Sequence, residues 1–298
     1  MSGIQQWPSL ATAGEPADDA VGPFPLARFV ETWWSHLGGG DPMTVEAGDC
    51  VLPMTREGRV IQIAGDADLT DYHSPLGHDL EGLGAALAAL VGEGHRLALD
   101  SLPERSARSL ARGLAGAGVE AEAVPDVVAA VLPLDSGQSH LGRLSKRHRH
   151  EARRKRRRYE ETAGEVVVVT GSDRDAFDRF AELHRSSPGR KGDFMSGNRA
   201  AFFADLAVQP GWRIDELRAR ERTVAALFGY HEDQVYYLYN SAYDAAFREA
   251  SPGIVLLVEV IEALRADGVL RLDFLKGEEE YKFRLGARPR QLYRIDVG

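Results

Sequence analysis

Four residues close together in the second half of the sequence have the types that bind an anion. They are Arg248, Ser251, Pro252 and Gly253. Serine can cap a helix, proline fits the first helical turn, and glycine lets another group approach the backbone closely. The free N–H groups and the dipole at a helix start attract negative charge. A plain capped helix is the alternative interpretation, but the added charge of Arg248 favours a phosphate site.

A segment rich in tyrosine precedes this loop. It reads Tyr236-Tyr237-Leu238-Tyr239-Asn240, and as a strand it would project tyrosines to both faces of a sheet. We count Asn240, at its end, with the anion-binding residues. Tyr239 could protonate a leaving group, although a tyrosine in a strand more often packs with its hydroxyl at the rim.

Two ionisable residues nearer the C-terminus could serve proton transfer or substrate binding. Asp273 ends a predicted strand shortly before Gly277 and could act as a general base or orient an acceptor. The alternative for Asp273 is a carboxylate that caps the following turn. Lys282 could bind phosphate or substrate, or could be a solvated lysine in a surface salt bridge.

A charged loop follows the helix that we expect to end at His184. It contains Lys191-Gly192, and loops of this kind often make substrate contacts. We therefore count His184, Lys191 and Gly192 as substrate-binding candidates. A histidine that caps a helix C-terminus is the alternative interpretation of His184.

Composition excludes several classes of protein. Cys50 is the single cysteine, so one chain can form neither a disulfide nor a cysteine-based metal site, and the histidines lack metal-like spacing. We therefore predict no metal. The N-terminus has no basic and apolar signal pattern, and no apolar run approaches the ~20 residues of a membrane span. We expect a cytoplasmic protein.

The charge is distributed very unevenly. The chain has a net charge of −9, yet the window Arg143–Tyr159 holds ten basic residues and one acid, so it carries +9 and the remaining residues carry −18. This window could be a solvated linker helix packed against acidic protein surface. Alternatively, Arg153–Arg158 could clamp the phosphates of CoA, a nucleotide sugar or tRNA, or could contact an anionic lipid surface. The window has no interleaved aromatic residues, so sequence-specific nucleic-acid binding has no support.

The elements that must position these residues follow from hydrophobic periodicity and turn signals. Expected helices are Pro25–Leu37, Leu80–Val91, Glu104–Leu114, Asp175–His184, Asn198–Val208 and Ile254–Ala266. Expected strands are Met43–Val45, Cys50–Thr55, Arg59–Ile63, Leu97–Leu99, Ala121–Val124, Val127–Leu132, Val166–Thr170, Trp212–Leu217, Thr223–Tyr230, Gln234–Asn240, Leu270–Phe274 and Gln291–Val297. Each half therefore reads helix, three strands, a Ser-Pro loop, a helix and a strand, which indicates an internal repeat.

The repeat predicts an α/β protein with a mixed sheet and two lobes joined by a basic helix. We expect a disordered leader over residues 1–23, a first lobe over 24–135, the basic linker helix over 136–162 and a second lobe over 163–298.

The order of three antiparallel strands, a loop and a phosphate-binding helix resembles the GNAT acyltransferases. Their acyl-CoA loop has the form Gln/Arg-x-x-Gly-x-Gly/Ala, and Arg248-Glu249-Ala250-Ser251-Pro252-Gly253 departs from it only where serine replaces the first glycine. The sequence is more closely similar to the CelD-like acetyltransferases and to the FemABX peptidyltransferases, which carry two GNAT units. Further matching residues are Leu183-His184, Lys191-Gly192, Asp273-Phe274-Leu275, Gly277 and Tyr281-Lys282.

The resemblance implies two tandem GNAT-like lobes and transfer of an acyl group, from acetyl-CoA or another acyl-CoA, onto an amine or hydroxyl. Asp273, Tyr239 and Lys282 would be catalytic, while Arg248, Ser251, Pro252, Gly253 and Asn240 would hold the donor. His184, Lys191, Gly192, Gly277 and Tyr281 would contact the acceptor, a small molecule or a cell-envelope or polysaccharide precursor. Two alternatives stay open: a peptidyltransferase that uses aminoacyl-tRNA, and a non-catalytic scaffold that binds polyanions.

Overall fold

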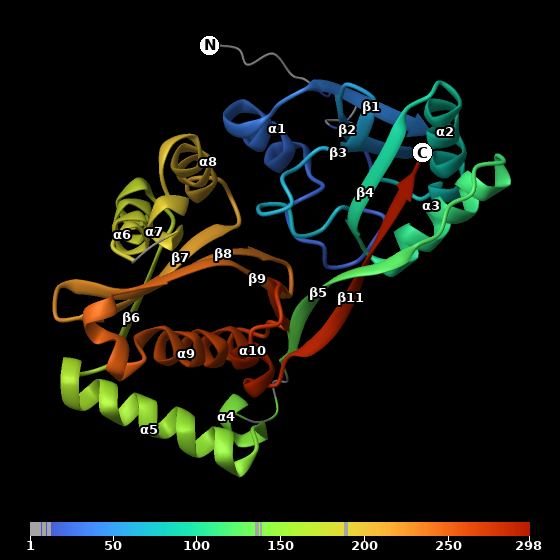
Figure 1. The fold of residues 1–298 in the computed structure, drawn as a ribbon. Helices are drawn as coiled ribbons and strands as arrows, with labels where there is room; N and C mark the ends of the chain where they lie inside the picture. Colours follow the sequence, from blue (N-terminus) through green and yellow to red (C-terminus); the bar gives the residue numbers. More distant parts are fainter. Residues whose placement is uncertain (1–6, 8–9, 11–12, 135–136, 138, 188–189) are drawn as a thin grey trace. The chain divides into compact units, whose positions relative to one another are not determined.

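The computed structural model describes residues 7, 10, 13–134, 137, 139–187 and 190–298, and it divides the chain into two compact units (Figure 1). Unit 1 contains the chain up to Val128 together with Arg290–Gly298, and unit 2 is Ala129–Pro289. Each unit has helices packed on a mixed sheet.

Unit 1 is built on an antiparallel meander followed by a parallel strand. Its elements are α1 (Ala27–Leu37), β1 (Asp41–Ala47), β2 (Cys50–Glu57), β3 (Val60–Ile63), α2 (Leu80–Gly92), β4 (Arg96–Leu102), α3 (Glu104–Gly116), the start of β5 (Val124–Pro133) and most of β11 (Arg288–Val297). Strands β1, β2 and β3 pair antiparallel, and β4 is parallel to β3. Helices α2 and α3 cross at two glycines, because a Cβ on Gly84 would lie 2.9 Å from the Cα of Gly113.

The segment before α1 is packed into unit 1, which corrects the prediction of a disordered leader over residues 1–23 for the part that the structure describes. The Ala17 N–H donates to the Pro75 carbonyl at 2.8 Å, and the Ser74 hydroxyl donates to the buried Asp18 carboxylate at 3.0 Å. The segment is rich in alanine, glycine, proline and aspartate, which suggested disorder, but several of its apolar side chains enter the core. These are Trp7, Leu10, Ala17, Val21 and Phe24.

Unit 2 repeats the same order with additional helices. Its elements are the end of β5, α4 (His140–Arg143), α5 (Lys146–Ala163), β6 (Val167–Gly171), α6 (Arg174–Arg185), α7 (Arg190–Phe194), α8 (Gly197–Ala207), β7 (Trp212–Ala219), β8 (Arg222–Glu232), β9 (Val235–Tyr243), the 3-10 helix η2 (Ala245–Ala250), α9 (Pro252–Ala266), β10 (Arg271–Lys276) and α10 (Glu280–Arg284). Strands β6 to β9 are antiparallel, and β10 is parallel to β9.

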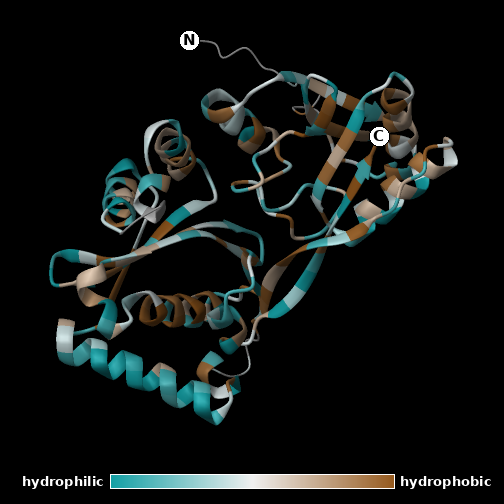
Figure 2. Ribbon diagram, in the orientation of Figure 1, coloured by the Kyte–Doolittle hydropathy of each residue, from teal (hydrophilic) through white to brown (hydrophobic). Residues whose placement is uncertain are grey.

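Three layers surround the central strands of unit 2. The apolar helix α9 covers one face of the sheet, α6 and α8 cover the other, and α5 packs on the outside of α9 (Figure 1). Hydropathy follows this order, since α9 is mostly brown while α5 is teal along most of its length (Figure 2). The basic segment is therefore a helix of unit 2 rather than a linker between units.

Each of two long strands follows the elements of one unit in the sequence but pairs with a strand of the other unit. Strand β5 follows the elements of unit 1, but its second half pairs antiparallel with β10 of unit 2. Strand β11 follows the elements of unit 2 and pairs antiparallel with β4 of unit 1. The compact units therefore differ from the expected ranges 24–135 and 163–298. Alternating apolar residues predict that a segment is a strand, but they do not predict the strand with which it pairs.

The repeated order predicted from the sequence is present, with two local differences. Residues Ala121–Ala123 precede β5 as irregular chain rather than forming a separate strand. Ser251-Pro252 stands directly at the start of α9, whereas Ser74-Pro75 lies in a loop that bridges to β2 through Leu76, and Asp79 caps α2 instead. The two Ser-Pro pairs are therefore not equivalent positions.

Candidate functional site

The central parallel strands of unit 2 separate after three residue pairs. Strands β9 and β10 pair over three residues, from Val235 with Arg271 to Tyr237 with Asp273. After Asp273, β10 shifts its register relative to β5, and Leu275 takes a positive φ of 60°. The Asp273 carboxylate stabilises this change by accepting the Leu275 N–H at 2.8 Å. Beyond Tyr237, the edge of β9 that would face β10 pairs with no strand in the described part of the chain.

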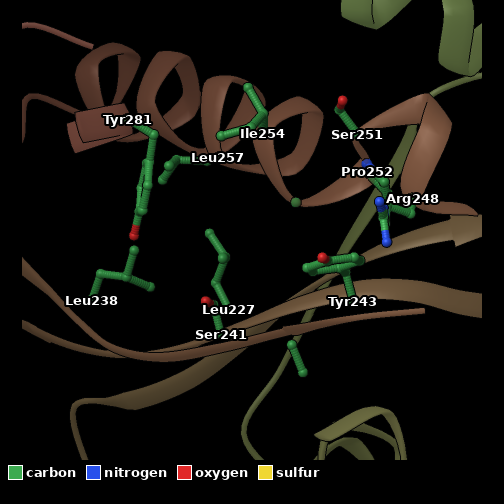
Figure 3. A pocket seen from close by; sticks show the side chains of 12 residues that line it. Leu227, Leu238, Ser241, Tyr243, Arg248, Ser251, Pro252, Ile254, Leu257 and Tyr281 are labelled. Atoms are coloured by element: carbon green, nitrogen blue, oxygen red, sulfur yellow. The ribbon is translucent and has the colours of Figure 1, made fainter. Parts of the chain in front are cut away.

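A cavity of about 320 Å³ lies next to this opening, between α9 and strands β8 and β9 (Figure 3). Its two ends differ in chemistry. Arg248, Tyr243 and the start of α9 form a polar end, and Tyr281 and Leu238 border an apolar end (Figure 3). The full lining is Leu227, Leu238, Ser241, Ala242, Tyr243, Arg248, Ser251, Pro252, Gly253, Ile254, Leu257 and Tyr281. A ligand with an anionic part and an apolar part fits such a cavity.

The start of α9 has the geometry of an anion site. Ser251 has a φ of 53° and a ψ of 50°, a left-handed conformation that favours glycine, so its backbone follows the course that a glycine would take there. Pro252 has no N–H, and no backbone carbonyl of the described residues accepts the N–H of Gly253. The first free donor of the helix therefore belongs to Gly253, a residue that lines the cavity.

Gly253 is not needed for the fold. A Cβ added there would meet its nearest neighbour, Tyr243 Cδ1, at 3.9 Å, which is ordinary contact, and its φ is not in the left-handed region. Gly253 also lines the cavity. Close approach of a ligand to the backbone is a reason for glycine at this place.

Tyr281 enters the cavity from α10. Its ring packs edge-on against Phe274 at 6.1 Å, and its hydroxyl lies beside Leu238 (Figure 3). Burial, assisted by the negative charge of Glu279, raises the pKa of Tyr281 to about 12. The hydroxyl is therefore neutral at physiological pH and can donate a proton.

The predicted catalytic residues Asp273 and Lys282 hold the turn between β10 and α10. The buried Lys282 Nζ donates to the carbonyls of Lys276 at 2.8 Å and Gly277 at 3.1 Å, and it pairs with Glu279 at 2.8 Å. Burial would raise the pKa of Glu279, but the hydrogen bond from Lys282 outweighs it and the pKa is lowered. Neither Asp273 nor Lys282 lines the cavity, and the contact of Asp273 with Leu275 is the turn cap considered as the alternative for Asp273.

Tyr239 and His184 lie on the other face of the sheet, among aromatic residues. Tyr239 stacks on Phe203 of α8 with ring centroids 5.1 Å apart. His184 is buried, with Phe180 at 5.9 Å and Phe194 at 5.5 Å. These residues build the core under α6 and α8 rather than the cavity under α9.

The other predicted residues take three different places. The amide oxygen of Asn240 accepts the N–H of Ser241 at 2.7 Å, and Asn240 is not among the lining residues. Gly192 lies in α7, close to the preceding chain, since its Cβ would lie 2.5 Å from the Ser187 carbonyl oxygen. The side chain of Lys191 is outside the described part of the structure. The structure thus unites Arg248, Ser251, Pro252, Gly253 and Tyr281 in one cavity.

Sequence reasoning missed Ser241 and Tyr243 because of a β-bulge. In the register of β8 with β9, Phe228 faces Asn240 and Gly229 faces Leu238, so Tyr239 is an extra residue. After it, the side-chain alternation changes phase, which brings Ser241 and Tyr243 to the same cavity as Leu238. Gly229 was the available signal, since a Cβ there would lie 2.3 Å from the Tyr236 ring.

The described residues contain no group of three or more histidine, cysteine or acidic residues placed to hold a metal ion. None of their helices combines the length and the apolar character that a bilayer crossing requires.

Most of unit 2 is similar to a known protein family. Residues 146–283 match the model of a family described as the acetyltransferase (GNAT) domain. No curated protein matches the sequence.

The fold of the whole chain is similar to those of several solved structures. FemX is 12% identical with a TM-score of 0.63 and covers 98% of this chain and 96% of its own. L-PGS from Bacillus licheniformis is 12% identical with a TM-score of 0.61 and coverages of 95% and 93%. A tandem GNAT protein from the clavulanic acid biosynthesis pathway is 13% identical with a TM-score of 0.50 and coverages of 98% and 93%. At these identities the likeness shows the fold, and it confirms an α/β protein of two tandem GNAT-like units.

Proposed function

We propose that the cavity of unit 2 binds an acyl-CoA and that the protein transfers its acyl group to an amine or a hydroxyl. The observation that carries this proposal is the continuity of one cavity from an anion site at Arg248 and Gly253 to the neutral hydroxyl of Tyr281. The GNAT match of residues 146–283 supports acyl transfer as the chemistry.

Each end of the cavity has a role in this reaction. Arg248 and the N–H of Gly253 hold the donor phosphates at the positive end of α9. The acceptor attacks the thioester carbonyl carbon, and N–H groups on the open edge of β9 beyond Tyr237 stabilise the resulting oxyanion. Tyr281 then gives its proton to the sulfur as the carbon–sulfur bond breaks, and the proton that the acceptor loses on forming the new bond returns through solvent to the Tyr281 oxygen.

The donor-site geometry supports CoA despite the departure from the family loop. Serine replaces the first glycine of the Gln/Arg-x-x-Gly-x-Gly/Ala pattern, but Ser251 adopts the backbone conformation that glycine favours. The acceptor in this proposal is a small molecule or a precursor of cell envelope or polysaccharide, in line with the resemblance to CelD-like acetyltransferases. An open cavity also favours a transferase over a scaffold that has lost its chemistry.

A second candidate function is transfer from an aminoacyl-tRNA. The likeness to FemX, which extends over 98% of the chain, favours it. In that case Tyr281 and the open edge of β9 would serve the same carbonyl chemistry with an ester instead of a thioester. Binding of free acyl-CoA distinguishes the two donors.

The test is titration calorimetry of the full chain with a panel of acyl-CoAs. We expect at least one acyl-CoA to bind, and Gly253→Trp to abolish that binding because the indole fills the anion end of the cavity. Gly116→Trp is the matched control, since a Cβ at Gly116 meets nothing within 4 Å and the residue lies in unit 1. Absence of binding by every acyl-CoA, or equal binding by the Gly253→Trp variant, contradicts the proposal.

A further inference from the structure

Helix α5 presents a continuous basic face to solvent. Six of its side chains are exposed and lie within about 120° of one another around a helix of 3.6 residues per turn. They are Lys146, Arg147, His150, Arg153, Arg154 and Arg157. The opposite side of the helix carries the buried Tyr159, whose hydroxyl donates to the Arg218 carbonyl at 3.0 Å. The basic face therefore points away from the body of unit 2.

Only part of the positive charge of α5 is neutralised by the protein. Arg156 pairs with Glu259 of α9, Arg158 with Glu249 at 3.5 Å, and Lys155 with Glu151 at 3.5 Å. The five cations of the exposed face form no ion pair with any residue that the structure describes. These are Lys146, Arg147, Arg153, Arg154 and Arg157.

We propose that this face of α5 binds the phosphodiester backbone of a nucleic acid, without reading its sequence. Four of the five free cations are arginines, whose planar guanidinium groups match phosphate oxygens in pairs. From Lys146 to Arg157 the face extends about 16 Å at 1.5 Å per residue, so several phosphates can be contacted at once. This binding site is separate from the acyl-CoA cavity, which none of the five cations lines.

The composition of the face favours purely electrostatic contact over base stacking or insertion into a bilayer. It carries no phenylalanine, tyrosine or tryptophan side chain on which a base could stack, and His150 is its single ring. A helix that inserts into a lipid surface needs an apolar face toward the acyl chains, but the apolar side of α5 packs against α9 and contains Ala152 and Tyr159. Contacts are therefore electrostatic, and a polyanion with closely spaced phosphates offers them at the highest density.

The test compares two triple variants with the same loss of charge on the same helix. The first is Arg153→Gln with Arg154→Gln and Arg157→Gln, which removes free cations. The control is Lys155→Gln with Arg156→Gln and Arg158→Gln, which removes paired ones. Glutamine is a good helix former, and melting curves verify that both variants fold.

Fluorescence anisotropy measures binding of a structured RNA hairpin and of a DNA duplex across a salt series. For the full chain we expect affinity to fall with salt at a slope that reports up to about five contacts, at roughly −0.9 per contact for duplex DNA. The first variant should lose at least ~10-fold in affinity and about three contacts in slope. The control should stay within about threefold of the unmodified chain. A preference between RNA and DNA identifies the source of the phosphates.

Three outcomes overturn the proposal. One is no binding of either nucleic acid at low salt. Another is an equal loss of nucleic-acid affinity in both variants, which would mean that the affinity depends on the net charge of the protein and not on this face. The third is binding to phosphatidylglycerol vesicles, lost in the first variant, with no nucleic-acid binding. Acyl-CoA titration of the first variant is expected to be unchanged, so failure of this proposal and failure of the acyl-CoA proposal are distinguishable.

Discussion

In the proposed reaction, Tyr281 takes the chemical role that the sequence had suggested for Tyr239. Both are tyrosines near the separated strands, but Tyr281 reaches the cavity whereas Tyr239 stacks on Phe203 on the other face. The sequence predicts a strand for Tyr239 and assigns Tyr281 to no helix or strand. The bulge at Tyr239, which pairing with β8 creates, decides which side chains of β9 reach the cavity.

At this residue we predict a specific kinetic defect. Tyr281→Phe should lower kcat by about 10²-fold, the lower end of general acid catalysis, and leave the Kd for acyl-CoA unchanged. A thiophenyl ester, whose thiol is more acidic than that of CoA, should recover most of the rate because its sulfur leaves without a proton. Rates and binding constants for both donors provide the measurement.

The control for this prediction is Tyr243→Phe, at the polar end of the same cavity. It should change affinity more than kcat. If Tyr281→Phe lowers kcat no more than Tyr243→Phe, the acid role is wrong.

Among the elements, helix α6 is held to strand β7 by a buried charge network. Glu216 is fully buried and accepts two hydrogen bonds from Arg179, at 2.9 and 2.7 Å, and another from Thr223. Arg218 is the third partner of this carboxylate, with a guanidinium nitrogen 3.2 Å from an oxygen of Glu216. Burial would raise the pKa of Glu216, but these partners outweigh it and the pKa is lowered.

This network predicts a pH-dependent stability. A folded-state pKa below the unfolded value of about 4.5 means that the stabilisation is complete above that value and is lost as pH falls through the folded pKa. Glu216→Gln should therefore destabilise the fold by about 2 kcal/mol near neutral pH, and the difference should shrink in acid. Urea unfolding at both pH values measures it.

Glu280→Gln is the control for this prediction. Glu280 is exposed and pairs with Arg284 one turn along α10, so its removal should have little effect at either pH. A Glu216→Gln deficit that stays constant with pH would argue that the carboxylate charge contributes nothing.

The elements also show what a sequence can and cannot predict. The start of α9 was predictable because serine, proline and glycine act locally on the backbone that they occupy. The anion-site residues Arg248 and Gly253 followed from it. The buried role of Lys282 did not, because two of its partners are the main-chain carbonyls of Lys276 and Gly277, which the turn after β10 brings together.

For the whole molecule, the order of elements was predictable and the exchange of strands was not. Alternating apolar residues identify β5 and β11 as strands. Their partners are set by the sheets that form around β10 and β4, more than a hundred residues away in the sequence. The two compact units therefore begin and end at different residues from the two repeated halves of the sequence.

The pairing of β11 with β4 makes the last segment of the chain a ligand of unit 1. A chain ending at Ala287 should lose the burial of Leu292 and Ile295, both fully inaccessible to solvent, and with them at least ~3 kcal/mol of stability in unit 1. A synthetic peptide spanning residues 288–298 should then restore the melting temperature in a saturable manner, whereas a peptide with Ile295→Asp should not. Equal melting of the full and shortened chains would contradict this.

If the peptide binds, the protein can be divided at this point into two pieces whose reassembly is set by concentration, which is the basis of a fragment-complementation reporter.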